Sequence, residues 1–259
     1  MKKLTLAVAA AALLATAQAA RATPSTTYWT PATTYTQPFL LPHLTYDSYV
    51  AEQGALQNDY GFTIGVLPGD KFQAEVGADV LLPGYVKNNF YLNGKVTLVE
   101  GAYAKWQPGV SVGVLNVGFK TDISNYDTVH LSVGKTTPIG VLTVGGYYGA
   151  GSKVLWTSSK GTVNRSGFMA SYVSPDIVLD RVGVNKVNFI GDIATGDNYF
   201  GAYGGGLLVY FTPAIDLITG PVWFQDKQLY KNTYGTDFTW TVQVDIDFDL
   251  QKVKPAPKT

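Results

Sequence analysis

The sequence contains no cysteine. This absence excludes disulfide bonds, cysteine-ligated zinc, iron–sulfur clusters, thiol catalysis and haem attachment through a C-x-x-C-H motif. Charged residues are scarce, at 15% of the chain against roughly 25% in soluble domains, and the two signs cancel to a net charge of zero. A balanced charge gives no broad attraction to nucleic acid, so we expect no nucleic-acid partner. With two histidines and no cysteine, we expect no metal site and no other cofactor.

Long apolar runs are missing outside the N-terminus. Lys2 and Lys3 precede an uncharged run from Leu4 to Ala17, and Ala20-Arg21-Ala22 provides a small-x-small cleavage site. These features predict a secretory signal peptide over residues 1–22. No later run approaches the roughly 18 residues of a transmembrane helix. We therefore expect an exported chain whose mature part has no transmembrane helix.

The segment from Phe238 to Leu250 is the clearest strand pattern in the chain. It reads FTWTVQVDIDFDL, so apolar and polar residues alternate along its whole length. Successive side chains of a strand point to opposite faces. The segment therefore predicts a strand with one apolar and one polar face. Its thirteen residues exceed the usual five or six, and a tilted strand needs roughly 9–11 to cross a bilayer.

Prolines divide the rest of the chain at regular intervals. Those that lie in turn-like contexts are separated by 40, 30, 37 and 38 residues: Pro68, Pro108, Pro138, Pro175 and Pro213. Each interval can hold two strands and a loop, because proline suits turns better than ladder interiors. Polar stretches fall between them, over residues 51–59, 84–89, 120–127, 149–162, 195–198 and 226–236. The pattern predicts an all-β, antiparallel, up-and-down transmembrane β-barrel of about 12 strands over residues 40–250. Pro83 and Pro221 do not fit this rule.

Two terminal segments flank the predicted barrel. Residues 23–39 are rich in Thr, Tyr and Pro, and are too short to fold as an independent plug. We expect this irregular segment either to cross one mouth of the barrel or to enter its lumen. Residues 251–259 form a polar, proline-broken tail.

Periodicity alone leaves open which face of the barrel is buried. A soluble lipocalin-like barrel has its apolar face inside, whereas a membrane barrel has it outside. The length of the last strand favours the membrane, as do the three aspartates on its polar face. Aromatic residues at the ends of its apolar face, such as Trp240 and Phe248, also fit membrane interfaces.

With these features the chain resembles Gram-negative outer-membrane β-barrels. The segments YFTPAIDLITGPVWF (210–224) and TWTVQVDIDF (239–248) are similar to the ends of uncharacterised proteobacterial outer-membrane proteins. The resemblance implies location in the outer membrane, with outer-membrane lipid and the barrel-assembly machinery as partners, and it implies no activity. Such barrels usually end on an aromatic residue that the machinery recognises. Here nine residues follow Leu250, so we expect that signal at Trp240–Phe248.

A barrel of this size has a narrow lumen in which charged side chains matter. The polar faces supply candidate pore-lining residues: Lys71, Gln73, Glu75, Asp79, Lys95, His130, Asp192, Gln243, Asp245, Asp247 and Asp249. The last three form an acidic strip that favours cations if the lumen is open. The alternative is that Lys or Arg of the first and eleventh strands neutralises the strip and the lumen is closed by its own side chains.

These residues allow three functional hypotheses. The first is a narrow porin-like channel for ions or small solutes. The second is a non-conducting structural, adhesion or receptor barrel whose outer loops offer Tyr126, Trp156, Tyr199 and Tyr230 to a partner. The third is an outer-membrane lipid hydrolase, based on the H-x-S pair His130 and Ser132. That chemistry needs the pair to face lipid, but the neighbouring valines and leucine take that side, so we expect no enzymatic activity. His43, near the start of the first strand, is expected at the membrane interface.

Overall fold

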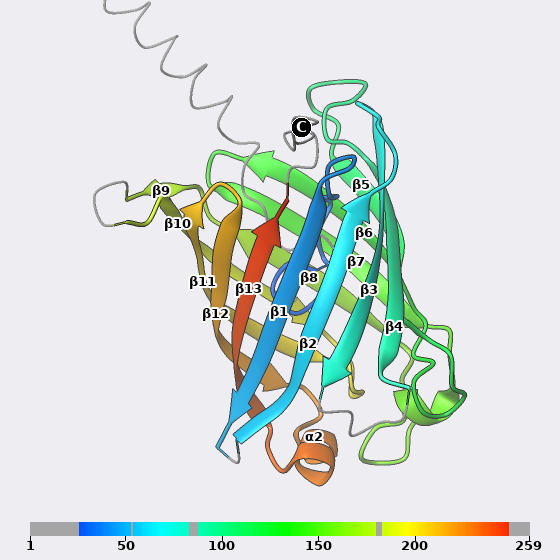
Figure 1. The fold of residues 1–259 in the computed structure, drawn as a ribbon. Helices are drawn as coiled ribbons and strands as arrows, with labels where there is room; N and C mark the ends of the chain where they lie inside the picture. The colour runs from blue at the N-terminus through cyan, green and yellow to red at the C-terminus, as the bar shows by residue number, and fades with distance from the viewer. Residues whose placement is uncertain (1–25, 53, 83–87, 180–182, 249–259) are drawn as a thin grey trace, which may run out of the picture.

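The computed structural model describes residues 26–52, 54–82, 88–179 and 183–248. Its strands form one antiparallel sheet that closes on itself (Figure 1). The strands are β1 (Pro42–Ala51), β2 (Gly54–Gly65), β3 (Phe72–Leu82), β4 (Phe90–Leu98), β5 (Gly109–Gly118), β6 (Thr128–Thr137), β7 (Gly140–Gly149), β8 (Ser166–Val173), β9 (Ile177–Val178), β10 (Lys186–Ala194), β11 (Ala202–Thr212), β12 (Ile215–Phe224) and β13 (Phe238–Asp247).

The predicted barrel of 12 strands is confirmed. Thirteen strand segments occupy twelve positions, because β8 and β9 both pair with β10. Between Val173↔Ile190 and Ile177↔Val187 one chain advances four residues and the other three, which is the signature of a one-residue bulge. Pro175 lies in this interruption. It therefore marks a break within the eighth strand position, not the turn that we predicted there.

The last strand closes the barrel against the first. Pairing between β1 and β13 runs from His43↔Asp247 to Val50↔Trp240, as the strand pattern predicts. The polar residues of β13 face inward, since Thr239, Thr241, Gln243 and Asp245 are at most 2% exposed. Trp240 points outward and is 46% exposed. The apolar face of the closing strand is therefore its outer face.

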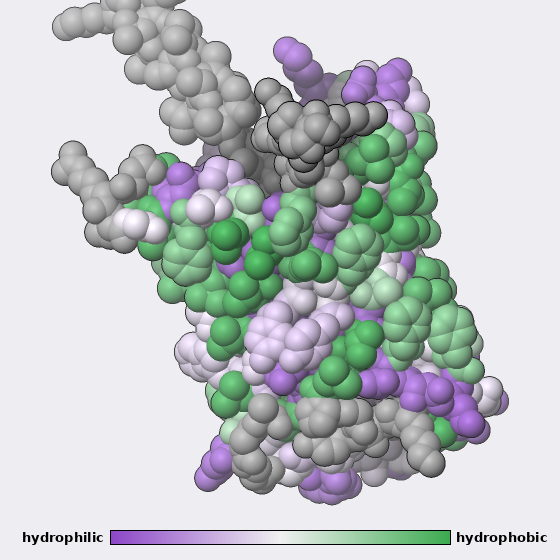
Figure 2. Space-filling view, viewed as in Figure 1, coloured by the Kyte–Doolittle hydropathy of each residue, from purple (hydrophilic) through white to green (hydrophobic). Residues whose placement is uncertain are grey.

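The same sidedness holds around the barrel. Large apolar side chains from successive strands are about half exposed on the outside, including Phe62, Val76, Val96, Val112, Leu131, Val144 and Phe189. On the face that Figure 2 views, apolar side chains cover much of the strand surface, with polar side chains among them. Water disfavours so continuous an apolar surface, whereas lipid accepts it. The exterior therefore matches the outside of a membrane barrel.

The two ends of the barrel differ in their connections. At the turn end lie the connections near Pro68, Pro108, Pro138 and Pro213, with the β9–β10 connection beside them. The loop end carries the connections between β5 and β6, β7 and β8, β10 and β11, and β12 and β13. Pro221 lies inside β12, beside a gap in the β11–β12 ladder between Gly204 and Leu207. Pro83, the predicted signal peptide (residues 1–22) and the predicted tail (residues 251–259) lie outside the described residues.

Short helices occupy two of the loops. The 3-10 helix η1 (Lys153–Trp156) lies between β7 and β8, and α2 (Lys227–Tyr234) lies between β12 and β13. We expected only a loop at α2. Its ends do carry helix signals, because the Asp226 carboxylate accepts from the N–H of Leu229 and Gly235 adopts φ +77°. Neither helix, nor any other in the described ranges, has the length and apolarity needed to cross a membrane.

Candidate functional site in the barrel lumen

The segment Thr26–Pro38, called the lumen segment here, lies inside the ring of strands (Figure 1). Every residue of the segment is buried or half-buried, and Tyr28, Thr30 and Ala32 are at most 1% exposed. This settles the choice between crossing a mouth and entering the lumen. The chain enters the lumen and runs from Gln37, near the turn end of β3, to Tyr28, beside Gly204 of β11.

Three serines from different strands hold the middle of the lumen segment. Their hydroxyls donate to three consecutive carbonyl oxygens: Ser132 on β6 to Pro31 (3.0 Å), Ser171 on β8 to Ala32 (2.6 Å) and Ser111 on β5 to Thr33 (2.8 Å). Ser111 and Ser132 are completely buried. Because the segment forms no ladder there, side-chain hydroxyls take the place of strand partners for its carbonyls.

Asp192 on β10 holds the start of the lumen segment. Its Oδ2 accepts the backbone N–H groups of Tyr28 (3.1 Å), Trp29 (2.9 Å) and Thr30 (2.7 Å), and the Thr30 hydroxyl at 3.0 Å. Asp192 is 6% exposed. Hydrogen bonds to an ionised group are roughly twice as strong as neutral ones. One carboxylate thus fixes three successive residues of the segment.

Glu75 on β3 holds the other end of the lumen segment. It accepts the N–H of Gln37 at 2.6 Å, and its second oxygen lies 3.3 Å from Nζ of Lys95 on β4. The side chains of Glu75 and Lys95 are each 2% exposed. The Gln37 amide also donates to Asp247 at 2.8 Å. The end of the lumen segment is therefore joined both to β3 and to β13.

Wall glycines leave the space that the lumen segment occupies. A Cβ added at Gly204 would lie 2.7 Å from the Tyr28 ring, and one at Gly134 would lie 2.8 Å from the Thr34 hydroxyl. At Gly65 an added Cβ would meet the carbonyl oxygen of Gln37 at 2.2 Å. Such distances are below van der Waals contact. The wall therefore fits the segment closely on several strands.

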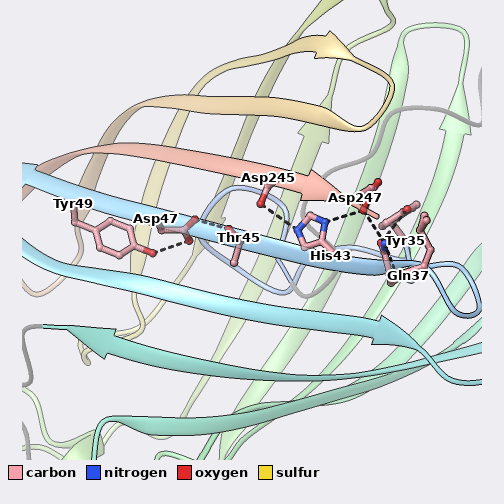
Figure 3. A network of polar contacts seen from close by, with 9 residues as sticks. Tyr35, Gln37, His43, Thr45, Asp47, Tyr49, Asp245 and Asp247 are labelled. Atoms are coloured by element: carbon pink, nitrogen blue, oxygen red, sulfur yellow. Dashed lines mark hydrogen bonds and ion pairs between the residues drawn. The ribbon is translucent and has the colours of Figure 1, made fainter. Parts of the chain in front are cut away.

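His43 links the acidic residues of the last strand (Figure 3). Its two ring nitrogens lie 3.1 Å from Asp245 and 3.1 Å from Asp247. Asp216 on β12 is opposite Asp245 in the ladder. Our placement of His43 at the membrane interface is wrong, since it is 6% exposed and shares the inward parity of Thr45 and Asp47. A histidine of the first strand thus contacts the acidic strip.

The loop-end half of the lumen holds a cavity of about 200 Å³. Residues Thr26, Tyr28 and Trp29 of the lumen segment line it on one side, and Asp47, Asp59 and Asp79 of β1–β3 on another. Six further aromatic side chains line it: Tyr49, Tyr199, Phe200, Phe224, Tyr230 and Tyr234. The cavity therefore combines carboxylates with aromatic rings.

The predicted pore-lining residues differ in where they lie. Buried in the lumen are Glu75, Lys95, His130, Asp192, Gln243 and Asp245, while Gln73, Asp79 and Asp247 are partly buried. Lys71 lies on the turn before β3, exposed, with its Nζ 4.5 Å from the centre of the Tyr103 ring. Asp249 lies outside the described residues. Whether any of these side chains lines a conducting pore stays a prediction.

Sequence reasoning missed the cavity carboxylates Asp47 and Asp59. The predicted loop 51–59 covered Asp59, but β2 begins at Gly54. The alternation of Thr45, Asp47 and Tyr49 in β1 was a usable signal.

His130 and Ser132 face the lumen, and the Ser132 hydroxyl donates a hydrogen bond to the carbonyl oxygen of Pro31. In the described part of the chain, no three His, Asp or Glu side chains are grouped to hold a metal ion.

The loop aromatics do not form the outward surface that we expected. Trp156 is completely buried, Tyr230 is 6% exposed, and the ring centroids of Tyr126 and Tyr199 are 3.9 Å apart. Tyr230 stacks on Phe224 with centroids 3.4 Å apart. These rings pack against other aromatic rings, and Tyr199 and Tyr230 also line the cavity. They are not available as a flat surface for a protein partner.

No protein-family model and no curated protein matches the chain. A structure from a study of in-meso crystallisation of membrane proteins overlaps 81% of this chain and 84% of its own, with a TM-score of 0.47 and 13% identity. The NanC porin in a rhombohedral crystal form overlaps 80% and 100%, with a TM-score of 0.46 and 10% identity. Pseudomonas putida OprB at low pH overlaps 81% and 92%, with a TM-score of 0.25 and 9% identity. No activity is carried over from similarities of this size.

Proposed function

We propose that this protein is an outer-membrane β-barrel channel for ions or small solutes, closed in the described conformation by its lumen segment. In this proposal the turn end faces the periplasm and the loop end faces outside, as in bacterial barrels with short periplasmic turns. The loop-end cavity is then the outer vestibule. The lumen segment is the barrier between it and the periplasm.

One observation carries the proposal: the barrier and the barrel wall are separate structures. Strand ladders close the wall completely, including the β1–β13 seam. The lumen segment is held instead by side chains of the wall, chiefly hydroxyls and carboxylates. Within the described residues, the bridge next to it is Phe39↔Gly65, one residue beyond its end. Water can replace hydrogen bonds of this kind at modest net cost. Removal of the segment from the lumen therefore leaves the wall intact.

A reversible covalent lock tests whether the lumen segment controls conduction. The hydroxyl oxygens of Thr36 and of Thr97 on β4 lie 2.5 Å apart. The two side chains therefore point toward each other, as a disulfide requires, and the double variant Thr36→Cys/Thr97→Cys tests whether one forms. No native cysteine interferes. In planar bilayers we expect conductance to be lost on oxidation and to return with dithiothreitol.

The single variants Thr36→Cys and Thr97→Cys serve as controls, since neither can form the lock. Their conductance should not respond to oxidation or reduction. If the oxidised double variant conducts like the reduced one, the lumen segment is not the barrier. If the reduced double variant and the wild-type protein are both silent across salts and voltages, the channel proposal fails.

The second candidate is a non-conducting barrel that binds a ligand from outside. The cavity of about 200 Å³ and the inward packing of the loop aromatics favour this over an adhesion surface. Silence in bilayers together with ligand binding would select it.

A further inference from the structure

Three carboxylates share the cavity, and no cationic side chain of the described residues is paired with them. Asp47 on β1 is directly opposite Asp59 on β2, and Asp79 on β3 is opposite Gly61, two residues along from Asp59. Directly opposed side chains have Cβ atoms roughly 5 Å apart, and like charges in that relation are destabilising. Among the described residues, the cavity lining contains no Lys or Arg, and the one histidine there, His43, contacts Asp245 and Asp247. The cluster therefore brings three acidic groups together, and any charge on them lacks a Lys or Arg counter-charge among the described residues that line the cavity.

The neutral contacts of these carboxylates leave oxygen atoms available. Asp47 accepts from the Thr45 hydroxyl at 2.8 Å and from the Tyr49 hydroxyl at 3.2 Å, and Asp79 accepts from the Asn93 amide. Within the described residues, Oδ1 of Asp59 is buried and has no hydrogen-bond partner. A buried polar atom without a partner costs free energy. A ligand that supplies positive charge here removes that cost.

Gln57 is a second, independent sign of a ligand. It is 9% exposed and lines the same cavity from β2. In the part of the chain that the structure describes, its side-chain amide makes no hydrogen bond. A buried amide aimed into a cavity is ordinarily satisfied by a bound molecule or water. The cavity therefore presents polar groups on more than one face.

The aromatic rings decide between a metal ion and an organic cation. Metal ions need several converging oxygen or nitrogen ligands, and the described residues contain no such group. Trp29, Tyr49 and Tyr230 line the cavity with further aromatic residues. Aromatic faces attract an alkylammonium group through their quadrupole, most strongly where water is excluded. Carboxylates on β1–β3 and rings around them suit a cation with an apolar surface.

We infer that this cavity binds a small organic ammonium ion. The assignment rests on the proposed function, for which it names the solute class taken up from the loop end. A cavity of about 150 Å³ is known to hold benzene. A cavity of about 200 Å³ therefore accommodates an ammonium compound of similar or slightly larger size.

Choline and its uncharged carbon isostere 3,3-dimethyl-1-butanol test the inference by isothermal titration calorimetry on the refolded protein in a non-ionic detergent. The two probes have the same shape and differ in charge. We expect choline to bind at least tenfold more tightly than the isostere. Equal binding of the two probes, or binding of neither, would overturn the inference without recourse to any variant.

Charge-removing variants locate the site. We expect Asp47→Asn/Asp59→Asn to weaken choline binding at least tenfold and to leave the isostere unaffected. The matched control Asp70→Asn removes an exposed carboxylate at the turn end and should not change binding. If the double variant does not fold, Asp59→Asn alone removes the carboxylate with the unpartnered oxygen. Choline binding that survives in a folded variant places the site elsewhere and overturns the assignment.

Calorimetry separates this inference from the proposed channel function. A barrel that binds choline but never conducts retains the site and refutes the channel. A barrel that conducts under control of the disulfide lock, but does not distinguish choline from its isostere, retains the channel and refutes the site.

Discussion

At the scale of single residues, the buried pair Glu75–Lys95 shows how much the lumen depends on charge balance. Removing one partner of a buried ion pair leaves an uncompensated charge and costs about 3–5 kcal/mol. We therefore expect Lys95→Met to lower the free energy of unfolding by that amount. The double variant Glu75→Gln/Lys95→Met should lose less, because no lone charge remains. Urea unfolding in lipid vesicles measures both changes.

The control for this prediction is the exposed pair Glu100–Lys135. Its charged atoms are 2.7 Å apart, but its side chains are 29% and 36% exposed. Exposed pairs contribute at most about 1 kcal/mol. Lys135→Met should therefore change stability much less than Lys95→Met. Similar losses in both variants would mean that Lys95 contributes through packing and not through its charge.

Sequence alternation predicted which residues face inward, but not what they contact. The inward positions of Lys95, His130 and Asp245 follow directly from the two-residue period of a strand. Their partners depend on register and on the lumen segment, which no local pattern specifies. His43 shows the limit. Whether a residue near a strand start faces the lumen or lies at the membrane interface depends on where the strand begins, and the sequence locates that boundary only to within a few residues.

At the scale of elements, α2 depends on Asp226, which caps the helix and holds a second loop. Its carboxylate accepts from the N–H of Leu229 at 3.0 Å and from the N–H of Ser159 at 2.7 Å. Burial opposes ionisation, but hydrogen bonds from Ser159 and Leu229 and the nearby Lys160 charge outweigh it. The pKa of Asp226 therefore lies below its usual value of about 3.9.

The depressed pKa gives a pH dependence of defined sign. A carboxylate whose pKa is lower in the folded state contributes stability that is complete above its unfolded pKa. That contribution is lost as the pH falls through the folded pKa. We expect α2 to persist from neutral pH to about pH 4 and to weaken below it. The amide NMR resonance of Leu229 should titrate with a midpoint below about 3.9.

Variants of Asp226 provide the control for that titration. In Asp226→Asn the Leu229 resonance should no longer titrate, while the side-chain oxygen still accepts hydrogen bonds. Asp226→Ala removes the cap and should cost about 1 kcal/mol of local stability. A Leu229 resonance that titrates unchanged in Asp226→Asn would show that another acid controls this loop.

The lumen segment is the element that the sequence specified least. Its threonines and prolines exclude a regular helix or strand, which left two positions open. The choice is made by Asp192 and three serines on other strands, and these lie between 78 and 164 residues away in the sequence. Contacts of such separation leave no periodic signal. The helix α2 is different, since its capping residues Asp226 and Gly235 were visible in the sequence.

At the scale of the whole molecule, the twelve strands could be predicted because two independent patterns agreed. Alternation located strands, and prolines located four of the turn-end connections. The eighth strand position was divided because a proline there interrupts the ladder without reversing the chain. The cavity could not be predicted. It depends on how far the lumen segment extends toward the loop end and on the two loops that line it, between β10 and β11 and between β12 and β13.

The separate construction of wall and lumen segment leads to a prediction for the entire barrel. Closed barrels resist detergent until boiled, so the refolded protein should migrate differently on gels before and after boiling. A variant lacking residues 26–38 should keep this shift, because every wall strand retains both neighbours. It should convert at a lower temperature than the full chain, because the contacts with Asp192, Glu75 and the lumen serines are gone. If the variant migrates identically before and after boiling, the segment is required to form the wall and cannot act as a removable barrier.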